Sequence, residues 1–285
     1  CKTHMGQNSK IEWTHHTCNP WWGCARVSPA CKYCYAESWA KRVGVEVWGK
    51  DSERRFFSDK HWAEPFKWNH EAAAARIRRR VFCASMADVF ENRRDLDGWR
   101  AKLWPIIEST PWLDWLLLTK RPQHIGHLAP WRELWPSNVW LGTTAENQKW
   151  ANERIERLME HPATVRFASC EPLLGEVDLT RWLAPVATGR GLNWVIAGGE
   201  SGAKSRPMNP AWAESIRDQC AAAQVPFHFK QWGHWGPHAN GPAARVQTIQ
   251  MIDHQGNAIR LFKLGKRASG RLLNGITWDQ VPQSE

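Results

Sequence analysis

Three cysteines lie close together in the segment GCARVSPACKYCYAE, residues 23–37. Six residues separate Cys24 from Cys31, and two residues separate Cys31 from Cys34. Two cysteines with two residues between them place both sulfur atoms on one tight turn, as zinc sites and iron–sulfur sites require. The spacing therefore predicts that Cys24, Cys31 and Cys34 bind a metal.

The number of thiols leaves three alternatives. A structural zinc ion takes four protein ligands, so it would need a fourth from Cys18, His15, His16 or the distant Cys83. A [4Fe–4S] cluster held by three thiolates leaves one iron free to bind the amino and carboxylate groups of S-adenosylmethionine, which is then cleaved reductively to a 5′-deoxyadenosyl radical. Three thiols without any metal are the third alternative, although buried cysteines usually occur singly.

The charge of the chain favours an anionic partner. The 285 residues carry a formal net charge of +10, and the sequence pI is about 9.4. Such a balance is typical of proteins that bind nucleic acid. The 21 tryptophans are expected mainly in the core, although some could stack on bases. The basic residues are concentrated at Arg76, Arg78, Arg79, Arg80, Lys120, Arg121, Arg260, Lys263, Lys266, Arg267 and Arg271.

Membrane and secretory signals are missing from the sequence as given. No stretch approaches the roughly 18 apolar residues of a membrane span, and the first residues lack the apolar run of a signal peptide. Residues 1–6 resemble an expression tag. Clustered thiols without a secretory signal indicate a reducing, cytoplasmic setting, with no membrane partner.

Short apolar runs alternate with helical patterns along the chain. The runs suit strands and the amphipathic segments between them suit helices, which predicts an α/β fold of parallel strands covered on both faces. We expect a full or partial (β/α) barrel with a C-terminal extension. The predicted strands are 81–85, 115–119, 139–143, 165–169, 194–198 and 226–230, with a further one at 11–14, and the predicted helices are 96–109, 147–161 and 210–224.

The predicted domain organisation has three parts. Residues 1–10 are expected to be a tag remnant or a disordered start, and residues 11–233 the barrel domain. The charged segment 42–80 reads as an insertion in that barrel. Residues 234–285, rich in Gly, Pro and His at their start, read as an extension.

Polar residues end six successive predicted strands. In α/β barrels the carboxyl ends of the strands carry the chemistry, and helix capping does not account for six polar ends in succession. This favours an enzyme over a pure binding module. The strand-end residues include Ser85, Asp88, Thr119, Lys120, Arg121, Thr143, Thr144, Glu146, Ser169, Glu171, Gly198, Gly199, Glu200, Lys230 and Gln231.

Several strand-end residues have individual roles predicted from their chemistry. Gly198 and Gly199 allow the backbone to approach a ligand closely, and Glu200 beside them is a hydrogen-bonding carboxylate or a helix cap. Lys230 lies among aromatic residues, where it either pairs with an acid or points into a site. Lys120 and Arg121 suit a phosphate contact or a solvated pair, Glu171 suits a substrate contact or a turn, and Cys170 suits a hydrogen-atom donor or a core residue.

The pattern C-x6-C-x-Tyr-C resembles the radical-SAM cluster motif, whose first interval is usually three residues instead of six. Beyond it, the chain resembles the phage-associated three-Cys-motif family, which is radical-SAM-like and of unassigned activity. The segments that carry this resemblance run from about residue 11 to 233. They are IEWTHHTCNPWWGC, SPACKYCYAE, LLTKRP, WLGTTAEN, SCEPLLG, WVIAGGESG and FKQWG.

The resemblance implies cofactor roles for particular residues. Cys24, Cys31 and Cys34 match the cluster ligands, and Tyr33 matches the aromatic residue that flanks the adenine of the cofactor. Thr144 and Glu146 match positions that often bind its ribose or methionyl part. The superfamily's Gly-Gly-Glu at the end of the second strand is replaced here by CASMAD, which contains Ser85, and the Gly-Gly-Glu at 198–200 lies on a later strand.

Our leading hypothesis is a radical S-adenosylmethionine enzyme with a [4Fe–4S] cluster, supplied by an electron donor, that modifies or repairs a nucleic acid or nucleotide. One alternative is a zinc- or cluster-stabilised nucleic-acid-binding protein without catalysis. Another is a radical enzyme that acts on a peptide or a small metabolite. Salt-sensitive binding of nucleic acid separates the leading hypothesis from the last one.

Overall fold

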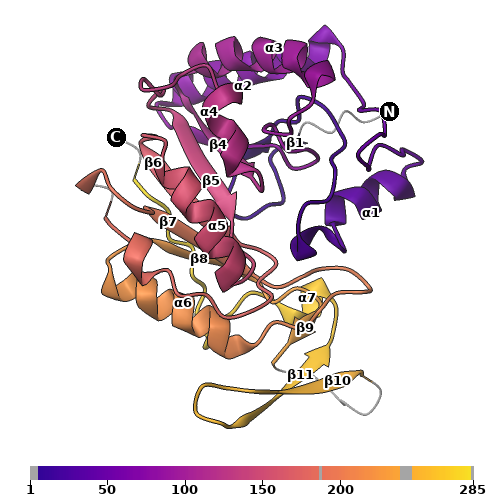
Figure 1. Ribbon diagram of the computed structural model, residues 1–285, viewed down its shortest axis with the longest axis vertical. Helices are drawn as coiled ribbons and strands as arrows, with labels where there is room; N and C mark the ends of the chain where they lie inside the picture. Colours follow the sequence, from indigo (N-terminus) through magenta and orange to yellow (C-terminus); the bar gives the residue numbers. More distant parts are fainter. Residues whose placement is uncertain (1–5, 186–187, 238–245, 284–285) are drawn as a thin grey trace. The chain divides into compact units, whose positions relative to one another are not determined.

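The structure is a computed structural model that describes residues 6–185, 188–237 and 246–283. Strands β1 to β8 follow one another in chain order in one eight-stranded sheet. Strands β2 to β8 run parallel in a curled half-barrel with helices (Figure 1). The predicted α/β class is therefore confirmed, and of the two predicted closures the partial barrel is the observed one. No helix within the described ranges combines the length and apolar character of a membrane span.

The chain divides into two compact units, residues 1–143 with 156–166 and 283–285, and residues 144–155 with 167–282. In the first unit, β2, β3, β4 and β5 pair in parallel, with Val81 opposite Trp115 and Leu117 opposite Leu141. Every residue of β5 is buried, as a strand covered on both faces requires. The elements are β1 (Gly6–Gln7), β2 (His16–Thr17), α1 (Tyr35–Arg42), α2 (Asp59–Ala75), β3 (Arg79–Cys83), α3 (Asp97–Glu108), β4 (Leu113–Thr119), α4 (Ile125–Leu128) and β5 (Val139–Thr144).

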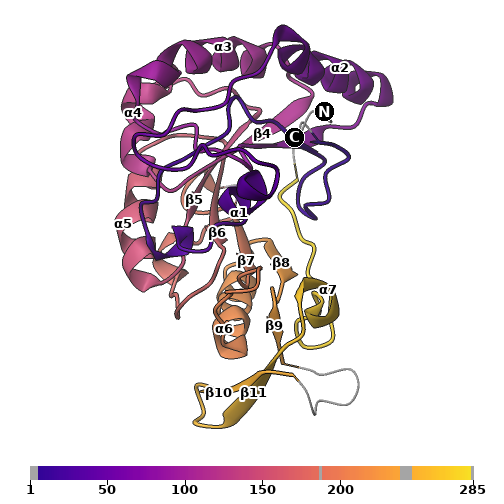
Figure 2. The same ribbon diagram turned by 90° about the vertical axis from the view of Figure 1, so that its right-hand side faces the viewer.

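The second unit holds the last four residues of β6, all of β7 and β8, and a small antiparallel sheet. Helix α6 packs on β7 and β8 (Figure 2). Asn209 caps α6 by accepting a hydrogen bond from the Ala211 backbone N–H, at 3.1 Å, with Pro210 as the first helical residue. The elements are β6 (Val165–Cys170), β7 (Trp194–Gly198), α6 (Pro210–Ala222), β8 (Phe227–Gln231), β9 (Trp235–Gly236), β10 (Thr248–Ile252), β11 (Ala258–Lys263) and α7 (Lys266–Ser269), and α5 (Gln148–Met159) begins in this unit.

Six of the seven predicted strands and all three predicted helices are confirmed, each with both bounds within two residues of those expected. The strand predicted at 11–14 is wrong. The segment forms a turn in which the Thr14 N–H donates to the Ile11 carbonyl, at 3.2 Å, and the short β2 follows two residues later. Its apolar pattern reflects the burial of Trp13, which is 1% exposed, and burial alone does not distinguish a turn from a strand.

The end of the chain returns to the sheet. The Phe229 backbone N–H donates to the Trp278 carbonyl at 2.9 Å, and His228 forms an antiparallel bridge with Asp279. The Trp194 indole also donates to the Gln280 carbonyl, at 2.9 Å. The tail thus covers β8, whose outer hydrogen-bonding groups would otherwise be an exposed sheet edge.

Candidate functional site

The three predicted metal ligands lie on one loop, residues 18–34, which we call the cysteine loop. It leaves β2 with the Cys18 N–H donating to the Phe82 carbonyl on β3, at 3.0 Å. The Gly23 N–H then donates to the Met86 carbonyl, also at 3.0 Å. Gly23 has φ of +114°, and a Cβ there would lie 2.3 Å from the Val47 carbonyl oxygen. The loop is therefore held against the segment that follows β3, and this close approach requires glycine.

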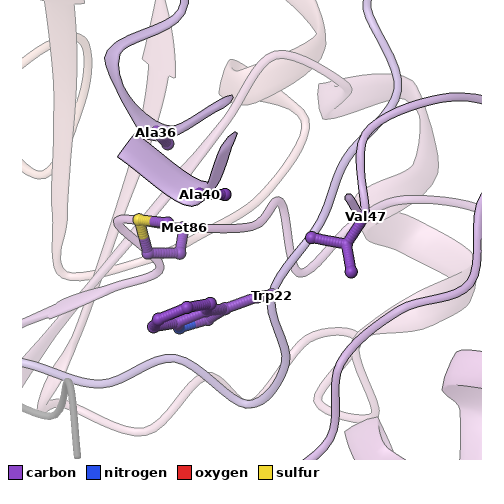
Figure 3. Packing of buried hydrophobic residues seen from close by; sticks show 5 residues of the cluster. All are labelled: Trp22, Ala36, Ala40, Val47 and Met86. Carbon is purple, nitrogen blue, oxygen red and sulfur yellow. The ribbon is translucent and has the colours of Figure 1, made fainter. Parts of the chain in front are cut away.

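A cluster of buried hydrophobic residues packs against the cysteine loop. Trp22 of the loop, Met86 after β3, and Ala36 and Ala40 of α1 are buried together with Val47 (Figure 3). Cys34 packs against this cluster. The loop thus rests on a packed core, which limits how far the thiol-bearing segments can move.

Asn19 connects the cysteine loop to the predicted cofactor residue Ser85. The Asn19 side-chain oxygen accepts from the Met86 N–H, at 2.7 Å, and its amide nitrogen lies 3.1 Å from the Ser85 hydroxyl. The Tyr35 hydroxyl donates to the Ser85 carbonyl, at 2.8 Å. Ser85 is half-buried just beyond the end of β3, beside the start of α1.

The three thiols are free and half-buried, and their surroundings differ. Cys34 directly precedes α1, where the backbone N–H groups of Ala36 and Glu37 bond to its sulfur. Lys120 acts electrostatically on the same sulfur. Burial raises the pKa of Cys34 above its usual range and that of Cys24 to about 12, against opposing effects of these donors and of Arg121. Metal binding at these thiols is therefore coupled to proton release.

Tyr33 is half-buried between the second and third thiols, with the Lys32 ammonium 5.3 Å from its ring centroid. The cysteine loop also carries an ion pair on its outer side, where Arg26 contacts Glu37 of α1 at 2.7 Å. Lys41 contacts the same carboxylate, at 2.9 Å. Two ion pairs thus meet at the buried Glu37, in the first turn of α1.

A buried ion pair lies directly behind Cys24. Arg121, just after β4, has its Nη1 at 3.4 Å from the Cys24 Sγ and at 2.9 Å from Asp88 Oδ2, while its Nη2 donates to the Ala25 carbonyl at 2.7 Å. The Arg121 side chain is 6% exposed. Burial alone would raise the pKa of Asp88, but Arg121 and hydrogen bonds from Thr119 and backbone groups lower it. Asp88 is therefore ionised at neutral pH.

The spacing of the possible ligand side chains and the chemistry of these side chains give different indications about metal binding. Within the described ranges, no three Cys, His, Asp or Glu side chains, the three thiols of the loop included, are gathered closely enough to hold a metal ion. His15 and His16 instead line a cavity of about 330 Å³ that also borders Arg79, the first residue of β3. The donor set itself suits an iron–sulfur cluster, because three thiols share one loop and hydrogen-bond donors face two of them.

In the second unit, the structure brings together three residues predicted from strand ends. The Lys230 ammonium on β8 contacts the two carboxylate oxygens of Glu171 at 3.2 and 3.3 Å. A Cβ on Gly198, the last residue of β7, would lie 2.7 Å from the same carboxylate. Ser169 also donates to Glu171, at 3.4 Å. The side chains of Lys230 and Glu171 are 17% and 13% exposed, so the pair is largely buried at the carboxyl ends of three parallel strands.

Thr144 and Glu146 lie at the end of β5 and are completely buried. Glu146 Oε2 accepts from Arg154 Nη1 at 2.6 Å, and the same nitrogen donates to the Thr144 carbonyl at 2.9 Å. Within the described part of the chain, Glu146 Oε1, Thr144 Oγ1 and the Nε and Nη2 of Arg154 have no hydrogen-bond partner. The Arg154 guanidinium does lie over the Trp150 ring, 4.3 Å from its centroid.

The remaining predicted residues have structural partners. Glu200 accepts from the Arg206 backbone N–H at 2.8 Å and from its Nε at 2.9 Å, which ties together the loop after β7. A Cβ on Gly199 would lie 2.0 Å from the Trp232 carbonyl oxygen, so this glycine allows two backbone segments to touch. Cys170 is 0% exposed at the end of β6, and burial raises the pKa of its thiol above the usual range.

The sequence alone did not single out the residues that hold other site residues in place. Asp88 was predicted only as one of the polar residues at a strand end. Glu91, which accepts hydrogen bonds from Arg54 at 2.7 and 3.1 Å, was not predicted at all. Asn19, inside the cysteine loop, was also missed. The available signal was an acid soon after a strand, DVFE at 88–91, in a chain whose next strand ends in a cation.

The family model described as "Protein of unknown function (DUF5131)" matches residues 8–282, which is nearly the whole chain. The chain belongs to this family. No curated protein matches this DUF5131 chain.

Among solved structures, the DUF5131 chain is similar to spore photoproduct lyases. One is complexed with dinucleoside spore photoproduct, with a TM-score of 0.48, 13% identity, and coverage of 92% of this chain and 72% of that one. A mutant form with bound AdoMet and dinucleoside spore photoproduct has a TM-score of 0.47 at 13% identity, with the same coverage. Both TM-scores lie below 0.5.

Proposed function

We propose that this DUF5131 protein is a radical S-adenosylmethionine enzyme in which Cys24, Cys31 and Cys34 hold a [4Fe–4S] cluster. The observation that carries the proposal is the cysteine loop, with three free thiols and charged or backbone donors directed at two of them. When bound, such a cluster supplies the electron that cleaves S-adenosylmethionine to methionine and a 5′-deoxyadenosyl radical, after an external donor has reduced it. The resemblance to the phage-associated three-Cys-motif family supports the same assignment.

We propose cofactor roles for six residues. Tyr33 would flank the adenine, and Ser85 would contact the cofactor beside the cysteine loop. Thr144 and Glu146 would bind its ribose or methionyl part, and their orphaned oxygen atoms support this role because buried polar atoms are normally bonded. Gly198 and Gly199 would let the backbone approach the cofactor.

We propose a nucleic acid or nucleotide as the substrate. The net charge of +10 supports an anionic substrate, and Lys120 provides a half-buried ammonium close to Cys34. Arg121 was predicted for the same role, but its guanidinium is bonded to Asp88 and Ala25, so we give the phosphate contact to Lys120. Glu171 would contact the substrate, and its ion-pair partner Lys230 would be a catalytic residue.

Two further catalytic roles complete the proposal. Cys170 would donate a hydrogen atom to a substrate radical, and Glu200 would bond a substrate hydroxyl or amine. Both would require a rearrangement, since Cys170 is fully buried and Glu200 bonds Arg206. We place the protein in the cytoplasm. The catalytic domain would span residues 11–233 with an insertion at 42–80, followed by an extension at 234–285. Residues 1–5 of the proposed tag remnant lie outside the described residues.

The test is anaerobic reconstitution with iron and sulfide, followed by reduction and addition of S-adenosylmethionine. We expect iron and sulfide to bind and 5′-deoxyadenosine to form, and Cys31→Ala to lose both. Cys220→Ala is the matched control, because Cys220 is a buried cysteine on α6 outside the loop. Zinc uptake with no iron and no 5′-deoxyadenosine would contradict the proposal and favour a metal-stabilised binding protein.

The substrate class has its own test. We expect the reconstituted protein to bind single-stranded DNA or RNA with an affinity that falls steeply as salt rises, since each neutralised phosphate releases counterions. Lys120→Gln should weaken binding and flatten that salt dependence. Formation of 5′-deoxyadenosine without salt-dependent nucleic-acid binding would favour a peptide or small-metabolite substrate.

A further inference from the structure

Arg121 joins the end of β4 to the cysteine loop. Its two terminal nitrogens reach two adjacent loop residues, the Cys24 sulfur at 3.4 Å and the Ala25 carbonyl oxygen at 2.7 Å. Two strands, β3 and β4, lie between residues 24 and 121 in the chain, so only tertiary packing brings these residues together. A guanidinium is planar and always charged, and its nitrogens bond in fixed directions. Contacts to two neighbouring residues therefore define the position of the loop at Cys24.

Asp88 fixes the orientation of this guanidinium. Its Oδ2 accepts from Arg121 Nη1 at 2.9 Å and from the Lys120 N–H at 3.1 Å, and its Oδ1 accepts from the Thr119 hydroxyl at 2.7 Å and the Phe90 N–H at 3.1 Å. Both carboxylate oxygens are thus fully used. An aspartate held in this way cannot rotate without losing several bonds, so Arg121 keeps its direction toward the sulfur.

A second buried pair holds the other side of Cys24. Arg54, whose side chain is 0% exposed, bonds Glu91 at 2.7 Å and donates to the carbonyls of Val47 and Gly49, each at 3.0 Å. The Gly49 N–H in turn donates to the Cys24 carbonyl, at 3.0 Å. Glu91 also lies 3.8 Å from Arg121. The backbone and the side chain of Cys24 are therefore both tied to one buried network of two arginines and two acids.

We propose that Arg121 is a positioning residue for the metal site of the cysteine loop, which donates a hydrogen bond to the Cys24 sulfur and makes a bound cluster easier to reduce. The inference rests on the proposed function of the loop. Reduction adds negative charge to a cluster and its thiolates, and both a charged donor and a hydrogen bond to a ligand sulfur stabilise that charge. Partners of this kind, one shell beyond the ligands, tune metal sites strongly.

Arg121→Gln is the test variant, because glutamine removes the charge and cannot reach Cys24, Ala25 and Asp88 together. Arg100→Lys is the matched control. Arg100 is equally buried and bonds the carbonyls of Glu91 and Arg93, at 2.9 and 3.0 Å, and no contact joins it to the three cysteines among the described residues. After anaerobic reconstitution, iron and sulfide are measured per chain. The midpoint potential is then followed by the electron paramagnetic resonance signal of the reduced protein.

We expect Arg121→Gln to shift the midpoint potential to more negative values and to retain less iron, and Arg100→Lys to match wild type in both. Wild-type iron content and potential in Arg121→Gln would overturn the inference while leaving the proposed function intact. Wild-type protein that binds no iron at all would overturn both. If Arg121→Gln fails to fold by circular dichroism, Arg121→Lys decides, with a smaller shift in the same direction expected and an unchanged potential and iron content overturning the inference.

Discussion

Each unit contains a buried arginine–carboxylate pair next to a strand end, and the two pairs differ in how completely they are bonded. In the first unit, Arg121 and Asp88 are 2.9 Å apart, and each Asp88 oxygen has two partners. In the second unit, Arg154 and Glu146 are 2.6 Å apart and at least as deeply buried. There, among the described residues, one glutamate oxygen and two arginine nitrogens have no partner.

This difference separates scaffolding from binding capacity. Buried polar networks rigidify a structure when every member is bonded, and they are costly when atoms are left without partners. In the saturated pair, neither Asp88 oxygen has bonding capacity left for a ligand, and Arg121 bonds Cys24 and Ala25, so the role of this pair is to hold the cysteine loop. The unsaturated pair retains an acceptor on Glu146 and another on Thr144, as a residue that bonds a ligand would.

The largest effect is expected from breaking the saturated pair. Asp88→Ala leaves the Arg121 charge buried without its partner, so we expect the free energy of unfolding to fall by about 3–5 kcal/mol. Urea unfolding followed by circular dichroism measures it. Asp97→Ala is the control, because Asp97 pairs with the buried Arg100 but is 61% exposed, and it should cost only about 1 kcal/mol. If both variants lost the same unfolding free energy, Asp88 would contribute no more to stability than the exposed Asp97, which would contradict the prediction.

Replacing both members of each pair sharpens the contrast. Glu146→Leu with Arg154→Met exchanges poorly satisfied charges for apolar groups, so we expect an unfolding free energy equal to wild type or up to about 2 kcal/mol higher. Asp88→Leu with Arg121→Met should stay destabilised, because the hydrogen bonds to Ala25, Lys120 and Phe90 are also lost. A stabilised Asp88/Arg121 double variant would show that its network is as dispensable as the other.

Two adjacent glycines at the end of β7, Gly198 and Gly199, are expected to differ in how much a substitution destabilises the protein. A Cβ at Gly199 would meet the Trp232 backbone at 2.0 Å, so we expect Gly199→Ala to cost about 3 kcal/mol of unfolding free energy. At Gly198 the nearest atom, at 2.7 Å, belongs to the Glu171 carboxylate, a side chain that can move. Gly198→Ala should therefore cost about 1 kcal/mol or less and act by shifting Glu171 away from Lys230. Thermal unfolding of both variants gives the order, and the reverse order would contradict it.

The smallest effect is expected at His16, which has one buried nitrogen without a hydrogen-bond partner among the described residues. It stacks on Trp68 with centroids 4.5 Å apart, its Nδ1 lacks a partner among the described residues, and burial lowers its pKa to about 4. The unfolded chain then binds the proton more readily, so stability falls as pH drops from 6.5 toward 4. Relative to His16→Phe, which keeps the stacking, wild type should lose on the order of 1 kcal/mol over this range after solvent screening. Parallel pH profiles of urea unfolding would contradict this.

The sequence was a good guide to elements and to the class of fold. Runs such as VWLGTT and VRFASC are too apolar for an exposed edge and too short for a helix, so periodicity and length sufficed for β5 and β6. IEWT failed because a buried tryptophan in a turn gives the same local pattern as a short strand. Such cases depend on contacts far along the chain, which local patterns do not contain.

Site residues could be predicted where their type and their position in the sequence already indicate a function. The cysteine spacing identified the loop, and the strand ends identified Glu171, Gly198 and Lys230, which the structure places together. The partners of Arg121 and Glu200 could not be foreseen, since the choice between a phosphate and Asp88, or between a substrate and Arg206, is made by tertiary packing. A lone charged residue in a sequence does not reveal which neighbour neutralises it.

The measurement that tests the central claim most directly is electron paramagnetic resonance of the reconstituted, reduced protein, with and without S-adenosylmethionine. If Cys24, Cys31 and Cys34 hold a [4Fe–4S] cluster with one iron open to the cofactor, wild type will show the signal of a reduced [4Fe–4S] cluster, and the cofactor will change it. Cys31→Ala will show neither the signal nor the change. A wild-type protein with no such signal, or with one that S-adenosylmethionine leaves unaltered, would contradict the account.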